Sequence, residues 1–252
     1  MDKPLVSVLM CLNKIDEYTS DAIESIINQT MKEIEIILVV NGDGVEENYN
    51  FLLEKYKAEQ RIKLISVPIG QLAFSLNVAL SHTKADLIAR MDTDDVSYLD
   101  RLQKQYDYLK NKDLDFVGCD INLINEFGHN IGKRVLPKGR DINKKLPFLN
   151  PFVHGSVMAK RSLFIAARGY NSGFNSEDYD LWLRLHRKGI KWDNMPDILL
   201  AYRIHSAATQ RRLLGYAEAT GLSVREFILN KNIINFFAIL FHFYKSVFRS
   251  RK

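Results

Sequence analysis

The chain has 252 residues, 46% of them hydrophobic and 26% charged, which describes an ordinary globular protein long enough for one large α/β domain. Its two cysteines have no metal-ligand spacing, so we expect no structural zinc site, and a reducing compartment fits. The net charge of +5 is uneven, because four basic residues and no acid lie among the last eight: Lys245, Arg249, Arg251 and Lys252.

The first part of the chain alternates short apolar runs with helical patterns. Residues 1–4 lead directly into the first run, so we expect no signal peptide. Strands are predicted at residues 5–11, 34–40, 62–67 and 87–91, and helices at residues 18–29, 46–57 and 71–81. Strands that alternate with helices of about a dozen residues imply a parallel, doubly wound sheet with right-handed crossovers.

The rest of the chain is less regular. A predicted helix at residues 101–112 and a strand at residues 115–124 precede a hairpin-rich region, residues 128–151, which glycine and proline punctuate. Beyond it, strands are predicted at residues 152–158 and 198–204, and helices at residues 161–167 and 177–185. We find no repeat, low-complexity tract or interdomain linker.

The predicted strand at residues 87–91 ends in three carboxylates within four residues, Asp92, Asp94 and Asp95. Unpaired carboxylates this close raise one another's pKa and lose solvation, and a divalent cation removes both costs. Mg²⁺ and Mn²⁺ prefer hard oxygen ligands, often one or two carboxylates plus substrate phosphates. The pattern is therefore consistent with a metal–diphosphate site at the carboxyl end of a central strand. The alternative is that Asp94 or Asp95 caps a helix beginning near Tyr98, with Asp92 in solvent.

Several landmarks occur together in one order along the chain. They are Val6-Ser7-Val8, residues 25–30 (Ser-Ile-Ile-Asn-Gln-Thr), residues 35–39 (Glu-Ile-Ile-Leu-Val), residues 89–95 (Ala-Arg-Met-Asp-Thr-Asp-Asp), Glu177-Asp178 with Leu181-Trp182, and Tyr202-Arg203. In this order and spacing they resemble the inverting glycosyltransferases of family 2, which have the GT-A fold. The Ala-Arg-Met-Asp-x-Asp-Asp segment further resembles bacterial enzymes that build capsular, exopolysaccharide or O-antigen repeat units. The resemblance covers about residues 4–212.

The resemblance implies a role for each acid. Asp94 would be the main ligand of Mn²⁺ or Mg²⁺, Asp92 would face the ribose or the metal, and Asp95 would be the helix cap. A metal neutralises the leaving diphosphate. Asp178 would be the general base that takes the proton of the acceptor hydroxyl, with Glu177 on the acceptor side. Without the resemblance, Glu177 and Asp178 could simply stabilise a helix start; Asp180 is the next candidate base.

The resemblance also implies contacts to the two substrates. The family usually places two acids after its second strand, whereas this chain has Val40 and Asn41, so uridine remains the expected base while deoxythymidine and guanosine stay open. Its Pro-x-Tyr-Asn element after the first strand is replaced by residues 11–14, Cys-Leu-Asn-Lys. Further expected donor contacts are Gly42, Gly70, Asn77 and one arginine of the late segment, Arg203 or Arg211, near the diphosphate. His154 is the expected acceptor contact.

This interpretation divides the chain into a GT-A domain, residues 1–222, and a helical tail, residues 223–252. The nucleotide-binding half would span about residues 1–120 and the acceptor half about residues 121–222. In the tail, the apolar, aromatic run at residues 233–244 is too short to span a bilayer, which takes about 20 residues. Followed by basic residues, it suits an interfacial helix on anionic lipid; packing on the core or a dimer contact are the alternatives.

The expected partners are a nucleotide-diphosphate sugar and a glycan or polyprenyl-diphosphate-linked acceptor. We expect the protein to be cytoplasmic and peripherally bound to the inner face of a bacterial cell membrane. Nucleic-acid binding is not expected, because the basic residues form no stripe with exposed stacking residues. The oligomeric state stays open.

Two other functions are alternatives to the glycosyltransferase. A sugar-nucleotide pyrophosphorylase would carry a glycine-rich loop after the first strand, and residues 11–14 contain no glycine. A catalytically inactive binding protein would have lost one of the acid motifs.

Overall fold

The computed structural model describes residues 3–171, 175–204 and 212–248. Its strands are β1 (Val6–Leu12), β2 (Ile34–Asn41), β3 (Ile62–Val67), β4 (Leu87–Arg90), β5 (Val96–Ser97), β6 (Phe116–Ile124), β7 (Asn130–Arg134), β8 (Met158–Lys160) and β9 (Trp192–Arg203). Its helices are α1 (Thr19–Ile27), α2 (Val45–Lys55), α3 (Leu72–Ser81), α4 (Arg101–Asn111), α5 (Arg140–Lys145), the 3-10 turn η1 (His154–Ser156), α6 (Arg161–Ala166), α7 (Glu177–His186), α8 (Arg212–Leu229) and α9 (Ile233–Phe248). The strands form one sheet in the order β3-β2-β1-β4-β8-β6-β9-β5, with β7 beside β6.

The four strands β3, β2, β1 and β4 are parallel, as the alternation of strands and helices predicts. All residues of β1 are buried, and successive side chains point to opposite faces of the sheet. Helices must therefore cover both faces of this half, as in a doubly wound sheet. Val8 and Met10 belong to the core cluster that contains the apolar stripe of α1. Leu9 and Cys11 belong to the cluster that contains the buried face of α3. The sheet therefore has a hydrophobic core on each side.

The other half of the sheet is mixed and differs from the sequence prediction in two places. Residues 152–158, expected to be a strand, instead form a turn through η1, and only Met158–Lys160 pairs with β4 and β6. The late strand begins at Trp192, six residues earlier than predicted, because β6 pairs along its whole length. The sequence pattern is broken at Pro196, which lies in a bulge where the register jumps from Met195 to Ile198. The helix α5 lies within the region expected to be rich in hairpins.

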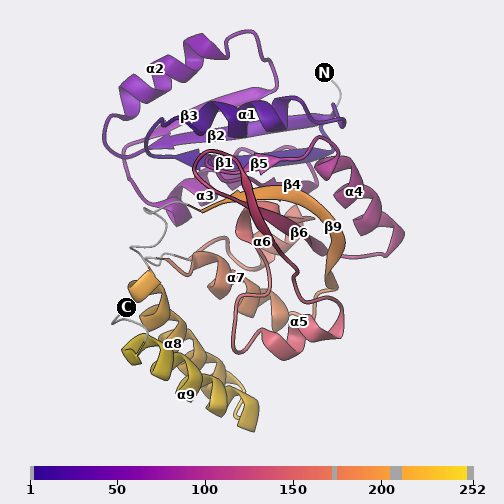
Figure 1. Ribbon diagram of the computed structural model, residues 1–252, viewed down its shortest axis with the longest axis vertical. Coiled ribbons are helices and arrows are strands. Elements are labelled where there is room, and N and C mark those ends of the chain that lie inside the picture. The colour runs from indigo at the N-terminus through magenta and orange to yellow at the C-terminus, as the bar shows by residue number, and fades with distance from the viewer. Residues whose placement is uncertain (1–2, 172–174, 205–211, 249–252) are drawn as a thin grey trace.

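The C-terminal helices α8 and α9 pack side by side and lie below α7 in Figure 1. The expected boundary at residue 222 falls inside α8, which is continuous there. Arg225 of α8 pairs with Asp180 of α7, and Glu226 of α8 pairs with Arg187, so charges tie the pair of helices to the sheet domain. Within the described residues, no helix combines the length and the apolar character needed to cross a membrane.

Candidate active site

The acid cluster follows β4, and its first member is held by a buried arginine. Arg90, the last residue of β4, is 2% exposed. Its guanidinium donates to Oδ1 of Asp92 at 2.5 Å and to the carbonyl of Leu9 in β1 at 3.2 Å. A charge-assisted bond of this kind fixes the carboxylate in one orientation. The second oxygen of Asp92, Oδ2, is then directed toward Gly155.

Asp95 does not cap a helix, so that expectation is wrong. The short strand β5, which pairs with β9, follows it directly, and α4 begins only at Arg101. Asp95 is 1% exposed, and its Oδ1 accepts the backbone N–H of Arg203 at 2.9 Å. Its Oδ2 has no hydrogen-bond partner among the described residues. Burial, together with the charges of Asp92 and Asp94, raises the pKa of Asp95 well above its usual range.

Gly155 brings the segment of residues 150–156 against these carboxylates. A methyl group added to Gly155 would lie 2.8 Å from Oδ2 of Asp92 and 3.1 Å from Oδ2 of Asp95, so both oxygens border one small space. The buried Arg101 donates to the carbonyl of Gly155 at 2.6 Å, which holds the segment in place. Oδ2 of Asp92 and Oδ2 of Asp95 therefore border the same space beside Gly155, and Arg101 fixes the backbone there.

These residues fit a divalent cation that takes some of its ligands from the protein and the rest from a bound substrate. No three His, Cys, Asp or Glu side chains in the described ranges could hold a metal by themselves. A magnesium ion in a phosphate-handling site usually takes one or two carboxylates, with phosphate oxygens and water completing its shell. The buried, unpartnered oxygen of Asp95 and the half-buried Asp92 and Asp94 give hard oxygen donors without closing that shell.

Two glycines expected beside the nucleotide lie together at the same edge of the sheet. Gly42 follows β2, and a Cβ added to it would lie 3.2 Å from Cα of Gly70 and 3.8 Å from Cβ of Asn13. Gly42 has a φ of 78°, a conformation that other residues rarely adopt. Asn41, at the end of β2, is buried. Asn13 follows β1 and was not predicted, although a polar residue just after a central strand is a signal for this edge.

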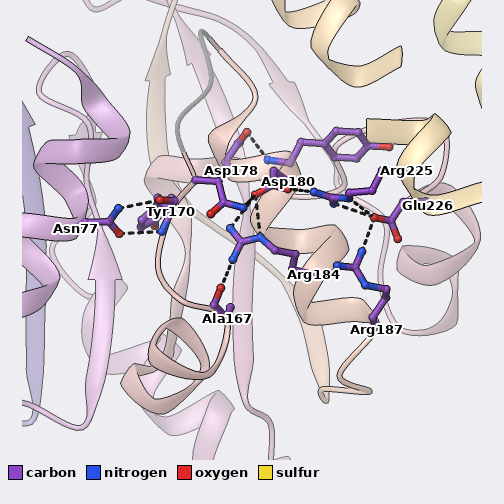
Figure 2. Close-up of polar contacts among 11 residues, drawn as sticks. Asn77, Ala167, Tyr170, Asp178, Asp180, Arg184, Arg187, Arg225 and Glu226 are labelled. Atoms are coloured by element: carbon purple, nitrogen blue, oxygen red, sulfur yellow. Dashed lines mark hydrogen bonds and ion pairs between the residues drawn. The ribbon is translucent and has the colours of Figure 1, made fainter. Parts of the chain in front are cut away.

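Asn77 takes a different place from the one expected. Its Nδ2 donates to the carbonyl of Tyr170 at 2.7 Å, and its Oδ1 accepts the N–H of Tyr170 at 2.8 Å. Both halves of the amide are thus used on one backbone segment (Figure 2). The amide therefore links α3 to the segment before α7, and the expected contact of Asn77 with the donor stays a prediction.

Arg203 is also placed differently from the sequence expectation. Its Nε donates to the carbonyl of Asp94 at 2.8 Å, and its Nη1 donates to the carbonyls of Asn125 and Glu126 at 3.2 and 3.0 Å. Its guanidinium carbon lies 4.2 Å from the ring centroid of Tyr18. These contacts hold the loop that carries Asp94, and a contact of Arg203 with the diphosphate stays a prediction. Arg211, the other expected phosphate contact, lies outside the described residues.

The acid pair opens α7. Oδ1 of Asp178 accepts the N–H of Tyr179 at 2.6 Å, and Oδ2 accepts Nδ2 of Asn150, also at 2.6 Å. Burial raises the pKa of Asp178 to about 6, and burial with the charge of Asp178 raises the pKa of Glu177 to about 7. Such values leave the pair able to exchange a proton near neutral pH. Asn150 was not predicted, since nothing in its local sequence marks it.

Asp180, the second candidate base, is occupied by other groups. Its carboxylate accepts Arg184 at 2.8 Å, Asn171 at 3.0 Å and Arg225 (Figure 2). It is 5% exposed, and two arginines and an amide already bind its carboxylate. Its role is to join α7 to α8.

His154 directly precedes Gly155 in the turn η1. Its Nε2 is 3.0 Å from the hydroxyl of Tyr170, and its ring packs edge-on against the buried Trp182. Burial, with the charge of Arg90, lowers the pKa of His154 to about 3, so the imidazole is neutral. A neutral imidazole can position a hydroxyl group but carries no charge to a substrate. Trp182 is fully buried and belongs to the hydrophobic core.

Comparison with known proteins adds four findings. A family model described as glycosyl transferase family 2 matches residues 7–166. The O-antigen biosynthesis glycosyltransferase WbnJ of Escherichia coli is 43% identical over 247 residues, 97% of either chain. The UDP-Gal:alpha-D-GlcNAc-diphosphoundecaprenol beta-1,3-galactosyltransferase of Escherichia coli is 28% identical over 219 residues, 84% of this chain and 78% of that one. A crystal structure of S. aureus TarS with UDP-GlcNAc superposes with a TM-score of 0.73 at 15% identity, over 98% of this chain and 73% of the other.

Proposed function

The chain belongs to glycosyl transferase family 2 and has the expected GT-A fold, and from this premise we propose that it is a metal-dependent, inverting glycosyltransferase. Its donor would be a uridine-diphosphate sugar, and its acceptor a hydroxyl of a lipid-linked or free glycan. The observation that carries the proposal is that residues 150–156 contact both acid sites. Gly155 borders Asp92 and Asp95, and Asn150 donates to Asp178.

The acids after β4 would hold Mn²⁺ or Mg²⁺ together with the donor's diphosphate. Asp94 and Asp92 supply the carboxylates, and Asn41, Gly42 and Gly70 line the nucleotide side. When bound, the metal neutralises charge that develops on the leaving diphosphate. Arg90 keeps Asp92 oriented before the substrate arrives, so little reorganisation is needed in the reaction.

On the acceptor side, Asp178 takes the proton of the attacking hydroxyl. That oxygen forms the new bond to the anomeric carbon while the bond from this carbon to the diphosphate breaks. The proton ends on Oδ1 or Oδ2 of Asp178, and the electron pair leaves with the nucleotide. One displacement inverts the anomeric centre. A base with a pKa near 6 is mostly ionised at neutral pH yet basic enough to accept the proton. Glu177 and His154 would contact the acceptor.

The relatives support the substrate class. One is named as an O-antigen biosynthesis enzyme and another as a transferase that uses UDP-galactose and a diphosphoundecaprenol-linked sugar. We therefore place this chain in bacterial surface-polysaccharide synthesis, acting on an acceptor that is presented at a membrane.

Helix α9 supports a peripheral position at that membrane. One face packs on the protein through the buried Ala238 and His242, and Nε2 of His242 lies 3.0 Å from the carbonyl oxygen of Pro147, which accepts its N–H, and 3.4 Å from the hydroxyl of Tyr179. The other side exposes large apolar residues at helical spacing: Ile233, Phe237, Leu240, Tyr244 and Phe248. Lys245 and the three basic residues among the last four of the sequence would add attraction to anionic lipid.

A pair of variants tests the proposal, because the two sites separate binding from chemistry. Asp94→Asn should abolish Mn²⁺-dependent binding of uridine diphosphate in calorimetry. Asp178→Asn should leave that binding intact and lower transfer by at least about 100-fold, the usual contribution of a general base. Transfer near the wild-type rate in Asp178→Asn would reject Asp178 as the base, and unchanged nucleotide binding in Asp94→Asn would remove Asp94 from the metal site.

A further inference from the structure

The side chain of Asn150 makes two hydrogen bonds that fix which way its amide faces. Its Oδ1 accepts the backbone N–H of Phe152 at 3.2 Å, and its Nδ2 donates to Oδ2 of Asp178 at 2.6 Å. A backbone N–H can only donate, so the amide oxygen must face Phe152 and the NH₂ group must face the carboxylate. The bond to Asp178 is therefore a donation to an acceptor that is strongest when ionised.

The two residues that follow Asn150, Pro151 and Phe152, are both held by contacts with the rest of the protein. Nδ2 of Asn194, from β9, donates to the carbonyl of Pro151 at 3.0 Å. The ring of Phe152 lies edge-on to Phe116 with centroids 4.6 Å apart, and both rings are buried. Asn150 itself is exposed, but its position is set by these buried neighbours. Its amide thus reaches the base from a rigid part of the molecule.

The other groups around Asp178 do not replace this donor. Glu177 and Asp92 are acids, and Tyr170 is a buried phenol whose pKa burial raises. The nearby cation, Arg90, is bonded to Asp92. In the described part of the chain, Asn150 is the side chain that donates to the carboxylate of Asp178, and the N–H of Tyr179 is the backbone donor. Each carboxylate oxygen keeps a lone pair for an acceptor hydroxyl.

We propose that Asn150 is a positioning residue, which holds the carboxylate of Asp178 in the orientation and charge state that a general base needs. This inference rests on the proposed function of Asp178. Hydrogen bonds to the ionised form of an acid favour that form, so the amide opposes the effect of burial. Loss of the hydrogen bond from Asn150 should raise the pKa of Asp178 and leave its carboxylate less well oriented, while nucleotide binding should not change.

The test compares Asn150→Ala with Asn130→Ala. Asn130 is a matched control, because its Oδ1 accepts the N–H of Gly132 two residues later, as Asn150 does with Phe152, but it has no contact with the acid pair. In protein labelled with ¹³C at aspartate carboxyl groups, the signal of Asp178 is identified by its loss in Asp178→Asn. Its titration should move up by about one pH unit in Asn150→Ala, as expected for a lost bond to a charged group. Asn150→Asp should move it further, since it adds a like charge.

The kinetic readouts should follow the titration. In Asn150→Ala, kcat should fall by about tenfold, part of what a general base contributes, and the acid limb of the pH profile should move up with Asp178. Calorimetric affinity for uridine diphosphate with Mn²⁺ should stay at the wild-type value, and Asn130→Ala should change none of these quantities. Asn150→Gln, which keeps the amide, should recover part of the loss.

An unchanged titration of Asp178 in Asn150→Ala overturns the proposal, whatever happens to turnover or stability. A shifted titration in a protein whose Asp178→Asn variant still turns over supports the contact with Asn150 and rejects Asp178 as the base. The failure of this inference and the failure of the proposed function are therefore distinguishable.

Discussion

Gly155 is where the smallest change should disturb the metal side of the site. An added methyl group would lie 2.8 Å from Oδ2 of Asp92, whereas carbon and oxygen atoms normally stay roughly 3.3–3.6 Å apart. Asp92 would have to withdraw by about half an ångström, and its other oxygen is bonded to Arg90 at 2.5 Å. The backbone cannot retreat freely, since Arg101 holds the carbonyl of Gly155.

We expect Gly155→Ala to cost about 1–3 kcal/mol of folding free energy, the usual range for overpacking a filled site. If Asp92 binds the metal as proposed, its displacement should also weaken uridine diphosphate binding with Mn²⁺ by about tenfold, or about 1.4 kcal/mol. Thermal unfolding and calorimetry measure the two effects separately. Gly221→Ala in α8 is the control, because nothing lies within 4 Å of the added methyl group and helix propensity favours alanine.

The result that would refute this reasoning is full metal-dependent nucleotide affinity in Gly155→Ala. It would mean that the oxygens bordering Gly155 are not part of the nucleotide site, even if the variant were less stable.

Three further predictions concern pH, Arg203 and the C-terminal helix. Because the pKa of Asp178 is raised to about 6, the base is protonated below that value, so kcat/KM should fall as pH drops through about 6; a flat profile there would contradict the assignment. Arg203→Lys keeps the charge but loses the planar guanidinium that binds the carbonyls of Asp94, Asn125 and Glu126, so nucleotide affinity with Mn²⁺ should fall severalfold. Unchanged affinity would show that Arg203 does not position the loop of Asp94 for nucleotide binding. Phe237→Glu with Leu240→Glu should abolish salt-sensitive co-sedimentation with anionic vesicles, while Phe127→Glu, at a residue that is 74% exposed in another region, should not; binding that survives the double substitution would show that this face of α9 does not bind lipid.

The parallel half of the sheet could be predicted from the sequence because each of its strands is an apolar run between helical patterns. β3 has the expected bounds, and β1, β2 and β4 differ from them by one residue. The acids after β4 and at the start of α7 were predicted for a related reason. Charges directly after a buried strand or at a helix start are visible in a local window.

What the sequence did not predict depends on partners far along the chain. Asn77 pairs with a residue 93 positions away, and the guanidinium of Arg203 meets the carbonyl of Asp94 across 109 positions. Asp95 was expected to cap a helix because its pairing with the N–H of Arg203 appears only once β5 and β9 are adjacent. Asn150 sits in a proline-flanked loop that resembles any turn, and only its contact with Asp178 gives it a role.

The central claim is that a single displacement, assisted by Asp178 and by a metal at the acids after β4, transfers the sugar. The most direct measurement is the anomeric configuration of the transfer product, read by proton NMR after reaction of a uridine-diphosphate sugar with an alkyl-diphosphate-linked sugar acceptor and Mn²⁺. The proposed mechanism predicts that the product's configuration is opposite to that of the donor and that no product forms without the metal. A product with the donor's own configuration would contradict it.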